Sequence, residues 1–327
     1  MLKVRFYLKL MLVYLALVTG SLGTAYAGKD AGHGHDYRTF HSNGDIKYGQ
    51  IRDSYKSDLV MYLAGNQFMA MEELIKDFQK KNPDIKTVYV ETIPPGQILK
   101  GQILKQGEIR GQKTAQNPDL FASVNLGHLK KLKGKGIMSD YMIYTHNQLE
   151  LMVAKGNPKN IKGPKDLGRN DIVQSHPNPL TEGIFKFYGA QMLKDLGLYD
   201  RVTADKKCKG CWAVEGKTWF TQRHHRETPH RIENNKADVG IVWTTEVKHA
   251  KAEGRQIDGV SIPSPFNMAH KVGYAIGVLK TGKNSFNASR YLSYLGTNDA
   301  QSIYKKYGFV GASTEELKLK PIPLPKK

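Results

Sequence analysis

Residues 58–81 read DLVMYLAGNQFMAMEELIKDFQKK and contain a predicted strand, turn and helix. The apolar run from Asp58 to Leu63 has the length of a buried strand, and Ala64-Gly65-Asn66 follows it as a turn. The next segment is an amphipathic helix, because four apolar residues recur at i, i+3, i+7 and i+10. These residues are Phe68, Met71, Ile75 and Phe78.

The rest of the chain repeats this alternation of strands and helices. Further strands are predicted at residues 86–91, 119–122, 150–154, 171–173, 238–243 and 272–279. Helices are predicted after Pro94-Pro95-Gly96, from Thr181 to Leu196, from Thr228-Pro229 onward, and over residues 288–295 and 300–307. This spacing indicates βαβ units, so we expect an α/β protein with parallel sheets.

The composition is that of a globular protein with two domains or two lobes. The chain has 327 residues, of which 40% are hydrophobic and 24% charged, and this excludes wholesale disorder. Its two cysteines are too few for a disulfide scaffold. Lys and Arg outnumber Asp and Glu by 49 to 30, a net charge of +19. Such an excess suggests an anionic partner, which could be nucleic acid, a membrane surface or a small anion.

The first 27 residues have the pattern of a secretory signal peptide. A basic start precedes the apolar run Leu10–Val18, and Ala25-Tyr26-Ala27 is a cleavage motif, so cleavage is expected after Ala27. Nine apolar residues are too few to span a bilayer, which needs about 20. No cysteine follows the run, which argues against a lipoprotein. We therefore expect a periplasmic protein in an oxidising compartment, for which nucleic acid is a poor partner.

Two other segments show no helix or strand period. Residues 28–56 are rich in Gly, His and Asp and are predicted to form a flexible leader with room for one short strand. The leader histidines could bind a metal weakly, although a solvated tail explains them better. They are His33, His35 and His41. Residues 313–327 are predicted to form a basic tail, and its proline-rich end, Pro321–Lys327, is predicted to be disordered.

Four stretches of the chain occur in the order found in a known family. They are the strand, turn and helix that ends in Phe78-Gln-Lys, the sequence DLFAS at 119–123, NQLELMVAKGNP at 147–158 with Asp166-Leu167, and ADVGIV at 237–242 with YKKYGF at 304–309. Over about residues 57–312 the chain resembles the periplasmic molybdate-binding proteins of ABC importers, a branch of the type II periplasmic binding fold.

The resemblance implies a two-lobed α/β protein in which each lobe is a mostly parallel sheet flanked by helices, with a hinge between the lobes. Lobe 1 would comprise residues 57–142 and 255–312. Lobe 2 would comprise residues 143–254, with a Cys/His insert at 205–230. The implied function is that of a monomeric, non-enzymatic receptor without a cofactor. It would capture a small ligand, such as molybdate, tungstate or another oxyanion, for an ABC permease of the inner membrane or for a membrane sensor.

A buried oxyanion needs several fixed N–H and O–H donors, and helix N-termini supply them with a favourable dipole. Three predicted helix starts meet this need, at Asn66-Gln67, Pro179–Glu182 and Glu227-Thr228, and Ser123 lies just beyond a strand end. For any one of them alone, helix capping is the simpler explanation. The predicted ligand-binding residues are Asn66, Gln67, Pro95, Ser123, Thr181, Glu182, Arg226, Thr228 and Trp243.

The chain departs from the molybdate-binding pattern at these positions. Gly65-Asn66 and Pro94-Pro95-Gly96 stand where the family has Ser, and Trp243 stands where it has Tyr. Glu182 and Glu246 also fall near the expected site, and an ionised Glu that faced a dianion would repel it. A different oxyanion, or a ligand with a donor or cationic part, therefore fits the sequence equally well.

The insert carries cysteines and histidines at a zinc-finger spacing, C-x₂-C-x₁₂-H-x₅-H, so four residues are candidate metal ligands. They are Cys208, Cys211, His224 and His230. Export favours a Cys208–Cys211 disulfide and no metal instead. His224 and His225 could alternatively hydrogen-bond a bound anion, or lie at the surface. The alternative function is a metal-binding or enzymatic protein on the same fold, although the chain has no P-loop, G-x-S-x-G or H-E-x-x-H motif.

Overall fold

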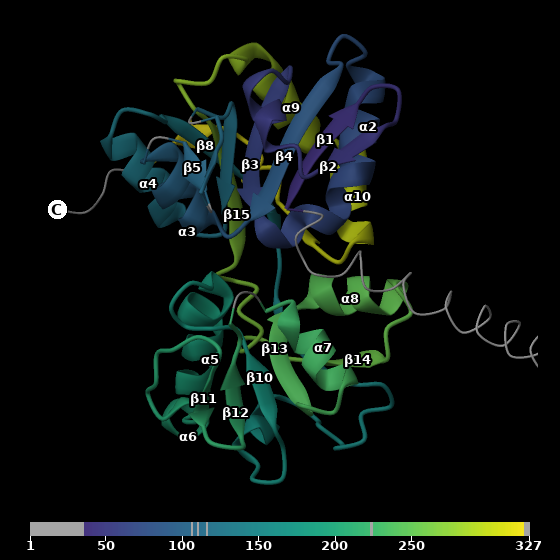
Figure 1. Cartoon of the computed structure of the whole chain (residues 1–327), viewed down its shortest axis with the longest axis vertical. Coiled ribbons are helices and arrows are strands. Elements are labelled where there is room, and N and C mark those ends of the chain that lie inside the picture. The colour runs from purple at the N-terminus through teal and green to yellow at the C-terminus, as the bar shows by residue number, and fades with distance from the viewer. Residues whose placement is uncertain (1–35, 106, 110, 116, 223–224, 324–327) are drawn as a thin grey trace, which may run out of the picture.

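The computed structural model describes residues 36–105, 107–109, 111–115, 117–222 and 225–323. The predicted signal peptide and the histidines His33, His35 and His224 lie outside these residues. The described residues form two lobes that follow one another along the long axis of the molecule (Figure 1), each with a β-sheet and surrounding helices. The two-lobed α/β fold predicted from the sequence is confirmed.

Lobe 1 is built around β3 (Leu59–Ala64), the strand of the segment quoted first, and all six of its residues are buried. Leu59, Met61 and Leu63 belong to one apolar cluster, whereas Val60 and Tyr62 belong to another, so both faces of the strand are covered. This explains why its sequence is continuously apolar rather than alternating. The amphipathic helix follows as η2 (Gly65–Ala70) and α2 (Met71–Lys81).

The strands of lobe 1 form one sheet. In order across it they are β16 (Val310–Gly311), β8 (Asp140–His146), β15 (Gly273–Val278), β7 (Leu120–Ser123), β3, β4 (Thr87–Ile93), β1 (Tyr37–His41) and β2 (Ile46–Tyr48). A small hairpin is formed by β5 (Glu108–Ile109) and β6 (Gln112–Lys113). The remaining helices of this lobe are η1 (Ile51–Tyr55), α3 (Pro95–Gln97), η3 (Ile98–Ile103), α4 (Leu126–Gly134), α9 (Ser285–Leu295) and α10 (Asn298–Lys306).

Lobe 2 contains the second sheet. Its strands, in order, are β11 (Cys211–Val214), β12 (Thr218–Phe220), β10 (Gln174–His176), β13 (Val239–Trp243), β9 (Leu149–Ala154) and β14 (Ile257–Ser261). Its helices are η4 (Pro164–Gly168), η5 (Ile184–Gly189), α5 (Ala190–Asp195), α6 (Tyr199–Thr203), α7 (Glu227–Glu233) and α8 (Thr244–Ala252). The strand predicted at 171–173 begins three residues later in the structure. This strand, β10, begins at Gln174, where pairing with β12 and β13 starts.

Both sheets are mixed, so the prediction of mostly parallel sheets is wrong. In lobe 1, β3 runs parallel to β4 and β7, but β15 runs antiparallel to β7 and β8. In lobe 2, β10 runs parallel to β12 and β13, but β9 runs antiparallel to β13 and β14. The chain changes lobes between these strands, so a strand can enter its sheet in the reverse direction from the βαβ units.

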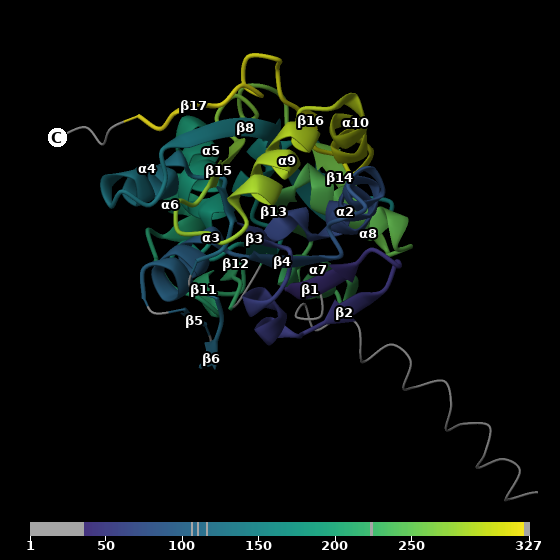
Figure 2. The same cartoon turned by 90° about the horizontal axis from the view of Figure 1, so that it is seen from above.

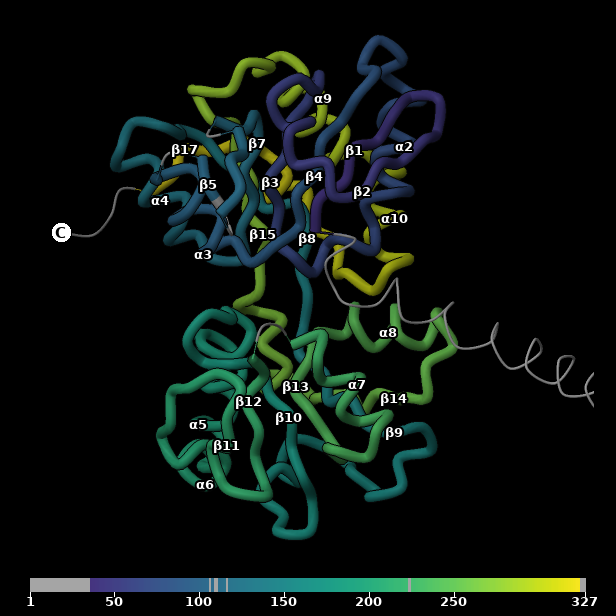
Figure 3. Tube along the Cα trace, in the orientation of Figure 1, coloured from purple at the N-terminus to yellow at the C-terminus, as the bar shows by residue number. Residues whose placement is uncertain are grey.

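The chain crosses between the lobes twice (Figure 3), at residues 147–148 and 262–272. The predicted boundaries are wrong at both crossings. β8 continues to His146 and pairs with β15 in lobe 1, whereas lobe 2 had been predicted to begin at residue 143. β14 pairs with β9 in lobe 2, whereas the return to lobe 1 had been predicted at residue 255. Both lobe boundaries are set by strand pairing within the sheets, and this pairing cannot be read from the local sequence.

The predictions of a flexible leader and of a disordered tail are wrong for the residues of these segments that the structure describes. β1 and β2 form a hairpin, and β1 pairs along its whole length with β4, which buries Tyr37 and Phe40. After α10, β17 (Lys320–Pro321) pairs with β8 (Figure 2), and Ile322 is only 1% exposed. Within the described residues, every helix is too short or too polar to cross a membrane.

Candidate functional site

A cavity of about 50 Å³ lies between the lobes. Since one water molecule takes roughly 10–15 Å³ of such volume, the cavity suits a ligand of a few heavy atoms. Its lobe 1 wall follows the carboxyl ends of three neighbouring parallel strands, β3, β4 and β7, where ligands of α/β sheets gather. The wall consists of Ala64, Gly65, Asn66, Pro94, Pro95 and Val124 from lobe 1, and Glu182, Gly183, Ile184, His225 and Trp243 from lobe 2.

Three helical segments begin at this cavity. Gly65 opens η2 and α2, Pro95 opens α3 and η3, and Ile184 opens η5 and α5. The first N–H groups of a helix have no acceptor within the helix, and the helix dipole makes this end partly positive. Helix starts from both lobes therefore border the same small volume, an arrangement that favours a small anion.

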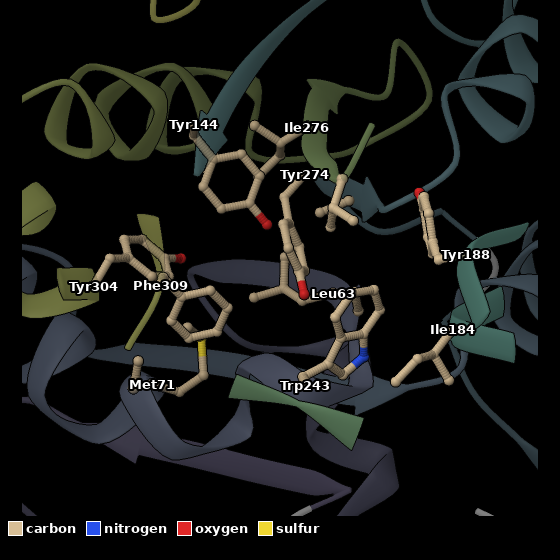
Figure 4. Packing of buried hydrophobic residues seen from close by; sticks show 14 of the residues in the cluster. Leu63, Met71, Tyr144, Ile184, Tyr188, Trp243, Tyr274, Ile276, Tyr304 and Phe309 are labelled. Carbon is tan, nitrogen blue, oxygen red and sulfur yellow. The ribbon is translucent and has the colours of Figure 1, made fainter. Parts of the chain in front are cut away.

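Aromatic side chains support the wall (Figure 4). Trp243 is 2% exposed, and its ring packs edge-on against Tyr188 with the ring centroids 5.6 Å apart. The amide nitrogen of Asn66 donates to the hydroxyl of Tyr274, and Asn147 reaches the same hydroxyl at 3.3 Å. Burial raises the pKa of Tyr274 well above its usual range, so this hydroxyl stays neutral. The contact with Tyr274 thus holds the Asn66 side chain in the wall.

His225 lies between two buried carboxyl groups. Its Nδ1 contacts Oε2 of Glu182, and its Nε2 lies 2.5 Å from Oε1 of Glu246. Burial lowers the pKa of His225, but the negative charges of Glu246 and Glu182 outweigh this effect and raise the pKa to about 10. His225 is therefore an imidazolium at neutral pH.

The carboxyl group of Glu182 is held by donors of its own lobe. Oε1 accepts from the hydroxyl of Thr221 at 2.7 Å and from the amide N–H of Asn178 at 3.1 Å, and Oε2 accepts from the amide N–H of His225 at 2.7 Å. These bonds and the imidazolium offset the repulsion that Glu182 would exert on an anion. The sequence had indicated this repulsion but not its compensation.

Four of the predicted ligand-binding residues line the cavity: Asn66, Pro95, Glu182 and Trp243. Two others support lobe 1 from outside the cavity wall. Gln67 is fully buried, and its Oε1 accepts from the hydroxyls of Tyr144 and Tyr304. Ser123 is also fully buried, and its Oγ lies 2.9 Å from Nδ1 of His128.

The remaining three predicted residues belong to lobe 2 and lie outside the cavity wall. Thr181 bonds through its N–H and hydroxyl to the Asn178 side chain, which is a local turn contact. Thr228 is buried, and its hydroxyl bonds to Ser175. Arg226 reaches across to lobe 1 and donates to the carbonyl oxygen of Gly65 at 2.8 Å.

Sequence reasoning missed the cavity-wall positions Pro94, Val124, Gly183 and Ile184, and it missed the pairing of His225 with both glutamates. A signal for the pairing existed. Glu182 and Glu246 were expected near the site, and a buried carboxylate requires a partner. Among the titratable residues nearby, the histidines of the insert were the candidates.

The Cys208–Cys211 disulfide predicted from the sequence is confirmed. Both candidate thiolates are thus absent, and in the described part of the chain no group of three or more His, Cys, Asp or Glu side chains is arranged to hold a metal. His230 is exposed, and its Nδ1 lies 3.1 Å from Arg255.

Comparisons with known proteins agree with this architecture. Residues 59–310 match the family described as bacterial extracellular solute-binding protein. The chain is 24% identical over 257 residues to YvgL of Bacillus subtilis (strain 168), described as an ABC transporter substrate-binding lipoprotein, and the match covers 78% of this chain and 86% of YvgL.

Two solved structures share the fold. The periplasmic molybdate-binding protein of Azotobacter vinelandii superposes with a TM-score of 0.60 at 20% identity, over 78% of this chain and 100% of that one. The sulfate-binding protein SubI of Mycobacterium tuberculosis superposes with a TM-score of 0.58 at 17% identity, over 79% of this chain and 87% of that one. The chain belongs to the bacterial extracellular solute-binding protein family.

Proposed function

We propose that this protein captures a small oxyanion in the periplasm and delivers it, as a monomer, to an ABC permease. Tetrahedral ions of the molybdate, tungstate and sulfate type are the first candidates. The observation that carries the proposal is the convergence of three helix starts from both lobes on a cavity of about 50 Å³.

The charges around the cavity are consistent with a protein-bound anion. Glu182 lines the wall, but its oxygens accept from protein donors and from the imidazolium of His225. The fold-related proteins named for molybdate and sulfate carry this ligand class on the same architecture. The cavity needs no catalytic group for this task, and we propose a binding function without an enzymatic step.

Calorimetric titration of the purified chain with molybdate, tungstate, sulfate and phosphate tests the proposal. We expect saturable 1:1 binding of at least one of these ions, and a smaller radius of gyration in X-ray scattering when the ion is bound. Absence of saturable binding by all four would overturn the oxyanion ligand. Asn66→Ala should weaken binding at least tenfold, because Asn66 lines the cavity, whereas Asn157→Ala, on a distant turn of lobe 2, should not.

The proposed location is tested separately. Cell fractionation should place the protein in the periplasm, and mass spectrometry of the purified protein should show a chain that begins at Gly28. An intact N-terminus on the purified protein would contradict cleavage after Ala27. Co-purification with a permease in detergent, and not with a sensor kinase, would support the importer over the sensor.

A further inference from the structure

Two side chains of lobe 2 donate hydrogen bonds to backbone carbonyls in the lobe 1 wall of the cavity. We propose that these residues, Arg226 and Tyr188, are positioning residues that latch the closed lobes together and set how long the ligand remains bound. The inference rests on the proposed function only for the ligand that is used to test it. The contacts of Arg226 and Tyr188 are observed whichever ligand the protein binds.

Arg226 forms the first latch through three contacts with lobe 1. Its Nη2 donates to the carbonyl oxygen of Gly65 at 2.8 Å, and its guanidinium carbon lies 4.3 Å from the centroid of the Phe68 ring. Its Nη1 lies 3.7 Å from Oδ1 of Asp36. A planar guanidinium can bond in its plane and stack on a ring at the same time, which Lys cannot do. The Phe68 ring also packs edge-on against His249 of lobe 2, with the ring centroids 5.0 Å apart. Phe68 of lobe 1 therefore contacts two side chains of lobe 2, Arg226 and His249.

Tyr188 forms the second latch. Its hydroxyl donates to the carbonyl oxygen of Val124 at 2.9 Å. Its ring packs against Trp243, so the residue is anchored in lobe 2 and is 6% exposed. Burial raises the pKa of Tyr188 to about 12, which keeps the hydroxyl a donor through the neutral range.

The latches act on the cavity wall itself. Gly65 and Val124, the two acceptors, both line the cavity, so closure and the geometry of the binding site depend on the same two carbonyls. Arg226 directly follows His225, which Glu182 and Glu246 fix within lobe 2. The buried cluster therefore sets where Arg226 projects.

The consequence for binding follows from a two-state equilibrium between open and closed lobes. A ligand held between the lobes leaves only after they open, and its apparent affinity scales with the closed population. Loss of a latch lowers that population. The effect should appear in the dissociation rate, since the ligand enters the open form, which makes neither latch contact.

Stopped-flow binding of molybdate, followed by Trp fluorescence, tests the latches in the purified chain. Arg226→Ala should raise the Kd by about 10- to 100-fold and Tyr188→Phe by about 3- to 10-fold, with koff raised by similar factors and kon within about threefold of the native value. Arg226→Lys should restore only part of the loss. Matched controls are Arg255→Ala, whose ion pair with Glu233 stays within lobe 2, and Tyr199→Phe, whose hydroxyl faces Asp205.

Scattering of the ligand-free chain separates a latch from a ligand contact. Arg226→Ala combined with Tyr188→Phe should enlarge the radius of gyration without ligand, whereas a side chain that only contacts ligand would leave it unchanged. An unchanged radius, an unchanged Kd, or a loss confined to kon would each overturn the proposal. If the native chain binds neither molybdate nor the other three ions, the proposed ligand fails, while the ligand-free radius still decides the latch.

Discussion

The imidazole Nε2 of His225 lies 2.5 Å from Oε1 of Glu246, while Nδ1 of the same ring contacts Glu182. The three side chains come from separate parts of lobe 2: the segment before η5, the loop before α7, and the first turn of α8. Glu182 is 3% exposed, and His225 and Glu246 are each 7% exposed. The His225 ring thus links its own loop to the two segments that carry Glu182 and Glu246. Its positive charge balances the negative charges of these two buried carboxylates.

The His225 cluster predicts a loss of stability at alkaline pH. The pKa of His225 is raised from 6.5 to about 10 in the folded chain, so its contribution to stability is fully present below about pH 6.5 and is lost as pH rises toward 10. His225→Gln should lower the free energy of unfolding at pH 7 by about 3–5 kcal/mol, since two buried carboxylates lose their cation. Urea unfolding between pH 6.5 and 10 measures both effects. An equal slope against pH in the native chain and the variant would refute this role of His225.

Two other histidines predict an opposite effect in acid. Burial lowers the pKa of His176 to about 3, and burial together with Lys100, Lys131 and Lys186 lowers that of His128 to about 4. The unfolded chain takes up protons below about pH 6.5 while these folded rings remain neutral, so stability should fall as pH falls from 6.5 toward 4. His128→Gln should flatten part of this slope in urea unfolding. His270→Gln serves as the control, and an equal change there would contradict the prediction.

The local sequence was sufficient to predict an element where the apolar pattern of its own residues shows which of its faces is buried. The apolar run of β3 and the period of α2 placed the core of lobe 1, and the predicted export indicated the disulfide. It was insufficient where burial comes from distant pairing. β1 and β17 are ordered because they pair with β4 and β8, and neither pairing leaves a periodic signal in so short a strand.

The site followed the same rule. Asn66 and Glu182, which line the cavity, were among the predicted residues because helix starts have recognisable residues. Arg226 was predicted as a ligand contact. The structure adds its bond to a backbone carbonyl of the other lobe, which side-chain motifs could not predict. The contact with Glu246 that positions His225 crosses 21 residues of chain and depends on the fold of lobe 2.

The disulfide predicts a modest contribution to stability and none to metal binding. Cys208 and Cys211 are three residues apart, so closing this short loop should stabilise the chain by only about 2 kcal/mol. Reduction, or Cys208→Ser with Cys211→Ser, should lower the melting temperature by a few degrees and leave the Kd for molybdate unchanged. Elemental analysis of the native and double-variant proteins should find no stoichiometric zinc in either. Zinc that disappears with the double substitution would favour the metal alternative.

Trp243 should report ligand binding. It lines the cavity, whereas the other two tryptophans, Trp212 and Trp219, pack against each other at 5.2 Å on β11 and β12. The change in fluorescence on adding ligand should therefore vanish in Trp243→Phe and persist in Trp212→Phe. Calorimetry should show that Trp243→Phe still folds and binds with a Kd within about tenfold of the native value. A signal that survives in Trp243→Phe would place the ligand elsewhere.

The C-terminal strand predicts that the last segment stabilises lobe 1. β17 pairs with β8, and Ile322 packs into the apolar cluster that contains Tyr62 and Phe121, where it is 1% exposed. Full burial of an Ile side chain contributes about 1.5–3 kcal/mol, and truncation of it also leaves a cavity. Ile322→Ala should lower the free energy of unfolding by about 2–4 kcal/mol in urea, whereas Leu319→Ala, at a side chain 56% exposed, should change it by less than about 0.5 kcal/mol. Equal effects at the two positions would mean that the segment does not pack on lobe 1 in solution.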